Sequence, residues 1–123
     1  MSETTAKALT RRRLPLGVRT AVKAAEGKKA EAIVVLDMRG AATFTDFFVI
    51  MHGLSSRQNT AVGEAVEAEL KARGFRPLGI EGSEHGEWIL LDYGSFIVHV
   101  FSRSARDHYA LEKLWGDAPK LFL

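Results

Sequence analysis

The sequence contains no cysteine and no long apolar run, and each absence excludes a class of protein. Without cysteine the chain cannot form disulfides, thiolate nucleophiles, iron–sulfur clusters or cysteine-ligated zinc sites. Its longest apolar runs, at 33–36 and 47–51, are far shorter than the roughly 18 residues of a membrane span. We therefore expect a soluble protein with no membrane partner.

The residues that are present are typical of one globular domain. The 123 residues are 46% hydrophobic and 26% charged, which suits a chain that buries an ordinary core. Residues 1–31 carry eight Lys/Arg against three Asp/Glu, whereas the remainder carries nine against twelve. Residues 1–13 are predicted to be a flexible basic arm and residues 14–123 a single domain. No apolar stretch of about 7–15 residues follows the arginines, as a secretory signal would require. We therefore expect a cytoplasmic protein.

Hydrophobic spacing predicts three helices and five strands in the order α-β-β-α-β-β-β-α. The run 33–36 fits a strand that is covered on both faces, and its short connection to the next strand favours antiparallel pairing. The predicted fold class is α/β, a single-domain sandwich with a mixed, about five-stranded sheet flanked by helices. The expected helices are 15–29, 55–74 and 104–116, the strands are 32–38, 47–51, 76–80, 88–92 and 96–101, and 117–123 is a tail.

Two residue pairs have the spacing of a capping box, in which a serine and a residue three positions later satisfy the free N–H groups of a helix start. Ser55 with Gln58 predicts the start of the second helix, and Ser104 with Asp107 that of the third.

No catalytic or metal site emerges from the polar residues. Asp37, Asp46 and Asp92 lie at strand ends, but no Asp-x-Asp pair exists to hold the metal of a nucleotidyl-transfer enzyme. The four histidines are scattered without the spacing of helical metal ligands, and the glycines do not form a phosphate-binding loop. We therefore predict no enzyme, no metal and no cofactor.

The aromatic residues of the C-terminal third are more informative. Trp88, Tyr109 and Trp115 belong to the predicted hairpin and last helix. Tryptophan and tyrosine fill cores, but they also supply much of the energy of protein interfaces. Their chemistry alone leaves both roles open.

The order and spacing of several motifs resemble the iojap-like ribosomal silencing factor (RsfS) family. The resemblance spans about residues 15–118. Its motifs are Asp37-Met38-Arg39, Thr45-Asp46-Phe47-Phe48-Val49-Ile50, Gly53-Leu54-Ser55-Ser56-Arg57, Gly82, Trp88-Ile89-Leu90-Leu91-Asp92-Tyr93-Gly94, Ile97-Val98-His99-Val100-Phe101, Arg106, and Tyr109 through Leu111-Glu112-Lys113-Leu114-Trp115.

The resemblance implies a fold distantly like the nucleotidyltransferase palm, without its catalytic acids, and a protein that is not an enzyme. It implies binding to large-subunit ribosomal protein L-fourteen, which sterically blocks joining of the small subunit and represses translation when nutrients are scarce. Carried over position by position, the implied partner-binding residues are Trp88, Asp92, Arg106, Tyr109, Glu112, Leu114 and Trp115.

Some positions depart from the family pattern. Family members often have an acid where Ser95 stands, acids near Arg103-Ser104, His at Gln58 and an aromatic at His108, so the rim is less acidic here. The alternative function is a nucleotide- or RNA-binding protein of nucleotidyltransferase-like fold. In addition, the basic arm is an auxiliary candidate for contact with ribosomal RNA. Whether the free protein forms a homodimer stays open.

Overall fold

The computed structural model describes residues 9–123, and residues 1–8 of the predicted arm lie outside the described residues. The remaining arm residues include a 3₁₀ turn at Arg11–Arg13, whose Arg11 guanidinium donates two hydrogen bonds to Glu26. The turn is followed by Leu14, which is buried in the core. The end of the segment expected to be flexible is thus attached to the domain.

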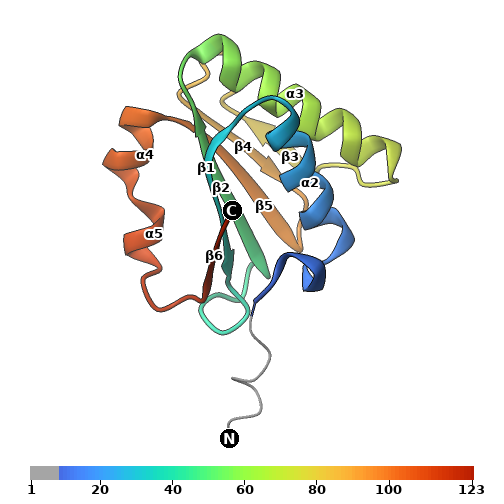
Figure 1. Ribbon diagram of the computed structural model, residues 1–123, viewed down its shortest axis with the longest axis vertical. Coiled ribbons are helices and arrows are strands. Elements are labelled where there is room, and N and C mark those ends of the chain that lie inside the picture. Colours follow the sequence, from blue (N-terminus) through green and yellow to red (C-terminus); the bar gives the residue numbers. More distant parts are fainter. Residues whose placement is uncertain (1–8) are drawn as a thin grey trace, which may run out of the picture.

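A mixed six-stranded sheet with the order β3-β4-β5-β2-β1-β6 forms the centre of the molecule (Figure 1). Strands β2 and β5 are parallel, and every other neighbouring pair is antiparallel, including the predicted β1–β2 pair. The strands are β1 Glu31–Asp37, β2 Phe47–Gly53, β3 Gly79–Glu81, β4 Trp88–Asp92, β5 Phe96–Ser102 and β6 Lys120–Phe122.

The four α-helices cover the two sides of this sheet unequally (Figure 1). Helices α2 (Leu16–Gly27) and α3 (Ser56–Ala72) cover one side, which we call the α2–α3 side. The shorter α4 (Arg103–Tyr109) and α5 (Leu111–Leu114) lie over the other, the α4–α5 side. Among residues 9–123, no helix combines the length and the apolar character needed to cross a bilayer.

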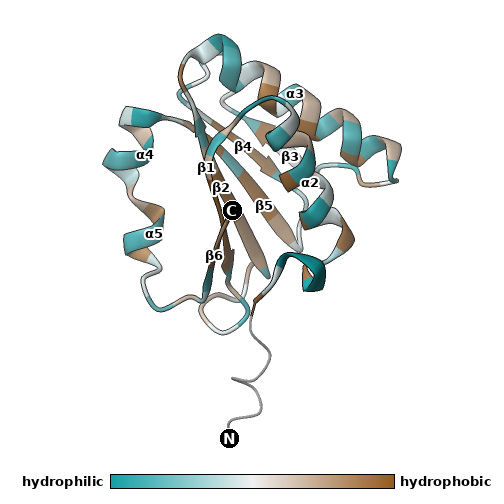
Figure 2. Ribbon diagram, in the orientation of Figure 1, coloured by the Kyte–Doolittle hydropathy of each residue, from teal (hydrophilic) through white to brown (hydrophobic). Residues whose placement is uncertain are grey.

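Strands β1, β2 and β5 are buried on both faces, as the continuous apolar runs predicted. Alternate residues of a strand point to opposite faces, so Ile33 and Val35 join the core of the α2–α3 side while Val34 and Leu36 join that of the α4–α5 side. The hydropathy colouring shows the central strands as apolar and the helices as mixed (Figure 2). The two cores share the central strands.

The second helix begins as predicted, with one difference in its cap. The Ser55 Oγ accepts the Gln58 N–H at 3.0 Å, but the Gln58 amide oxygen accepts from Leu54 rather than from Ser55. Its Nε2 donates to the carbonyls of Lys28 and Lys29 at 3.1 and 3.0 Å. Gln58 therefore also joins the start of α3 to the end of α2.

The expectation of about five strands and a C-terminal tail is corrected by β6. Within the segment predicted to be a tail, Lys120–Phe122 pair antiparallel with β1, with Leu121 opposite Val35. The Asp37 N–H adds a bond to the Pro119 carbonyl at 2.8 Å. A three-residue strand is too short to show alternation, and the free edge of β1 supplies its hydrogen bonds.

Candidate functional site

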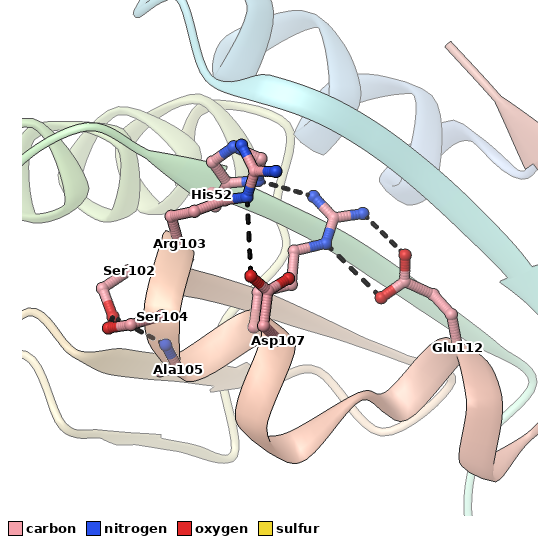
Figure 3. Close-up of polar contacts among 8 residues, drawn as sticks. His52, Ser102, Arg103, Ser104, Ala105, Asp107 and Glu112 are labelled. Atoms are coloured by element: carbon pink, nitrogen blue, oxygen red, sulfur yellow. Dashed lines mark hydrogen bonds and ion pairs between the residues drawn. The ribbon is translucent and has the colours of Figure 1, made fainter.

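The candidate site is the α4–α5 side of the sheet, whose helices are positioned by a cap at Ser102. The prediction that Ser104 caps this helix is wrong, because the Ser102 Oγ accepts the Ala105 N–H at 3.1 Å (Figure 3). Ser102 ends β5 with extended backbone, as an N-cap residue requires, whereas Ser104 is already helical. The Ser102 hydroxyl also donates to Glu87 at 2.8 Å, which ties the helix start to the loop before β4.

The helix predicted to run to Gly116 is interrupted at Ala110. This residue has a φ of 46°, in the left-handed region, and its N–H bonds the Arg106 carbonyl at 2.9 Å. The chain changes direction there and continues as α5, with Leu111 buried against the sheet. The interruption also brings Glu112 of α5 beside Arg106 of α4.

Arg106 lies inside the domain, with only 7% of its surface exposed. Its Nε and Nη2 donate to Glu112 at 3.4 and 2.9 Å, and its Nη1 donates to the Nδ1 of His52 on β2 at 2.9 Å (Figure 3). A guanidinium can only donate hydrogen bonds, so the Nδ1 of His52 must be the acceptor. His52 is therefore neutral, with Nδ1 unprotonated. Burial, then the charges of Arg106 and Arg103, lower the pKa of His52. These contacts make Arg106 a positioning residue that joins β2, α4 and α5.

Trp88 lies half-buried at the start of β4. Its indole N–H donates to the Nδ1 of His99 at 3.1 Å, and its ring packs against Phe101 and Tyr109 with centroid distances of 4.9 and 4.5 Å. Burial lowers the pKa of His99 to about 4, so this histidine is neutral and its Nδ1 can accept the hydrogen bond from the indole N–H. Tyr109 itself is 48% exposed. The structure thus brings two of the expected partner-binding residues into contact.

Two further exposed apolar residues, Phe44 and Leu114, lie beside Trp115. Leu114 is 69% exposed, and half-buried Trp115 packs edge-on against Phe48 with centroids 6.4 Å apart. Phe44, 57% exposed in the loop before β2, lies 6.1 Å from Trp115 between centroids. Sequence reasoning missed Phe44, although a lone phenylalanine in a short polar loop was a usable signal. We call Phe44, Trp88, Leu90, Tyr109, Leu114 and Trp115 the aromatic face.

Asp92 lies on the same face of β4 as Trp88, four residues along the strand. Its Oδ1 accepts the Gly94 N–H at 2.8 Å, and Gly94 has a φ of 83°, so the carboxylate stabilises the β4–β5 turn. Asp37 is also held locally, because Arg39 donates to both its oxygens and thereby lowers the pKa of the carboxyl. Within residues 9–123, no three histidine or acidic side chains cluster as metal ligands.

Comparison with known proteins identifies the family. The family model described as "Ribosomal silencing factor during starvation" matches residues 12–122. A ribosomal silencing factor RsfS from Halalkalibacterium halodurans is 43% identical over 103 residues, 84% of this chain and 88% of that protein. The chain belongs to the RsfS family. An RsfS protein from Bacillus subtilis is 39% identical over 83% of this chain and 86% of its own length.

A solved structure of a similar protein has the same fold. A crystal structure of a Chromobacterium violaceum protein superposes with a TM-score of 0.80 at 36% identity, covering 81% of this chain and 83% of that one. Membership of the RsfS family implies ribosome-associated regulation of translation. The RsfS resemblance read from the sequence is therefore confirmed.

Proposed function

We propose that this protein binds ribosomal protein L-fourteen through the aromatic face and sterically blocks joining of the ribosomal subunits, acting as a binding protein and not as an enzyme. The observation that carries the proposal is the aromatic face itself in a chain of the RsfS family. Three of its side chains, Phe44, Tyr109 and Leu114, are about half exposed or more, while both cores beneath are closed. Exposed aromatic and leucine side chains on one face are typical of a protein interface.

The charges around the aromatic face suit a basic partner. Asp92 and Glu112 are half-buried carboxylates on this side of the sheet. Asp92 is held in place by the Gly94 N–H and keeps its charge for a partner, whereas the charge of Glu112 is already paired with Arg106. Preorganised acids at an interface rim steer and align a positively charged partner. Bound to L-fourteen through this face, the protein would occupy space that the small subunit needs, and this block would repress translation under nutrient limitation in the cytoplasm.

The binding experiment compares two leucines on opposite sides of the sheet. Leu114→Ala should weaken binding of purified L-fourteen by about 1–2 kcal/mol in calorimetry, because it removes apolar contact from the interface. Leu16→Ala removes a leucine that is 44% exposed on α2, and this variant should bind normally. Equal affinities of the two variants would contradict the aromatic face as the binding surface.

A further inference from the structure

The outer surface of the α2–α3 side carries a groove that the proposed function does not use. The groove has a volume of about 520 Å³ and lies between α2 and α3. The cations that line it are Arg19 and Lys23 on α2, Lys28 just after α2, and Arg73 just after α3, all of them exposed. The one carboxylate in its lining is Glu69.

The groove continues toward the 3₁₀ turn. A neighbouring hollow shares Arg19 and Lys23 with it and adds Arg11 and Arg12. Arg11 is neutralised by Glu26 and fixes the turn against α2, so Arg12 is held at the end of the row. Five cations therefore face one carboxylate along this surface.

The cations of this row are not used to stabilise the described fold. Within residues 9–123, ion pairs join Arg11 to Glu26, Arg39 to Asp37, Arg103 to Asp107 and Arg106 to Glu112, and none includes Arg19, Lys23 or Arg73. Arg19 and Lys23 are four residues apart on one helix, a like-charge spacing that disfavours the helix slightly. A polyanionic ligand would reverse that cost.

We propose that this groove binds the phosphate backbone of structured RNA. From Arg19 to Lys28 the cations extend over ~14 Å along the helix axis, long enough to meet more than one phosphate. Leu16 is the one large apolar residue in the lining, so the surface lacks the anchors that an amphipathic protein segment or a membrane would need. The inference rests on the proposed function only in expecting the RNA to be ribosomal.

The position of the groove separates it from the aromatic face. Helices α2 and α3 lie on one side of the sheet, and α4 and α5 lie on the other (Figure 1). The two surfaces can therefore be occupied together, one by protein and the other by RNA. The RNA contact expected of the basic arm is thereby extended to a groove in the folded domain.

The test measures binding of the full chain to a fluorescent RNA hairpin by anisotropy, at salt concentrations from about 50 to 200 mM. The groove variant is Arg19→Gln/Lys23→Gln/Arg73→Gln. The matched control is Arg57→Gln/Arg76→Gln/Lys113→Gln, which removes three exposed positive charges outside the groove lining. Melting curves of both variants verify that the fold is retained.

We expect the groove variant to bind at least tenfold more weakly, and its log–log salt slope to fall by about 2–3, because three phosphate contacts are lost. The control should stay within about threefold of the unchanged protein. Equal weakening of both variants, or an unchanged slope, would overturn the proposal. Competition by polyglutamate as effective as by unlabelled RNA would also overturn it, in favour of an acidic protein partner. Leu114→Ala should bind the hairpin normally. The RNA result therefore does not depend on whether the protein binds L-fourteen.

Discussion

The two sides of the sheet are covered in opposite ways. On the α2–α3 side, the 17-residue α3 is uninterrupted and buries Val62, Val66 and Leu70 completely. On the α4–α5 side, seven- and four-residue helices separated by Ala110 leave Tyr109 and Leu114 exposed. Continuous helical cover closes a core, whereas interrupted cover leaves apolar side chains exposed. The same sheet thus carries a closed core on one side and the proposed recognition surface on the other.

The largest expected effect on stability comes from the closed side. Leu70→Ala should lower the free energy of unfolding by ~2–5 kcal/mol, because it empties a fully buried site in the core. Urea denaturation measures this loss, and the affinity of the folded fraction for L-fourteen should stay unchanged. A loss below about 1 kcal/mol would show that the α2–α3 side is loosely packed.

The aromatic face should show the opposite ranking. Trp88→Ala and Tyr109→Ala are each expected to weaken L-fourteen binding by roughly 2–4 kcal/mol, the range of interface hot spots. Each should cost less stability than Leu70→Ala, since Tyr109 is half exposed and Trp88 is only half-buried.

The affinity for L-fourteen, from calorimetry, and the free energy of unfolding, from urea denaturation, are measured on the same variants. A variant that melts early yet binds normally once folded would assign that residue to the core and remove it from the interface.

Acid should destabilise the protein through its neutral histidines. The pKa of His99 is about 4 in the folded state, against about 6.5 unfolded, so the unfolded state binds more protons between these values. Stability should therefore fall as pH decreases through this window, with His99 alone accounting for about 2 kcal/mol between pH 7 and pH 5. His52, whose pKa is also lowered, adds to the effect in the same direction.

His99→Gln supplies the control for this pH dependence. Glutamine keeps an acceptor for the Trp88 indole but does not titrate. Urea denaturation at both pH values should show a smaller difference for the variant than for the unchanged protein. An equal difference would mean that His99 does not govern the acid sensitivity.

The smallest expected effect concerns the helix interruption. Ala110→Gly should raise the free energy of unfolding by about 0.5–1 kcal/mol, because glycine adopts the left-handed φ of 46° without steric cost. Thermal melting measures the gain. A destabilised variant would show that the turn between α4 and α5 depends on the alanine side chain.

Much of the fold could be predicted because its signals are local. Three such signals are the apolar run 33–36, which is buried on both faces, the Ser55 cap and the helical spacing of the apolar residues of α3. Each depends on residues close in sequence. The parallel pairing of β2 with β5 and the addition of β6 to β1 depend on distant partners, which one sequence does not reveal. Ala110 interrupts a helix although alanine is the best helix former, so tertiary contacts override propensity there.

The candidate site was predictable to a similar extent. Trp88 and Tyr109 were singled out by residue type and family motif, and the structure places their rings in contact. The internal position of Arg106 could not be foreseen, because its partner His52 lies 54 positions away in sequence. Phe44 belongs to the aromatic face only through its contacts with Phe48 and Trp115 in the folded chain.

Subunit joining measured by gradient sedimentation tests the central claim most directly. Purified protein added to separated large and small subunits should lower the yield of joined ribosomes without any nucleotide and should sediment with free large subunits. The double variant Tyr109→Ala/Leu114→Ala should restore joining, whereas Leu16→Ala should inhibit it as the unchanged protein does. Undiminished joining at saturating protein, or equal inhibition by the double variant, would contradict the account.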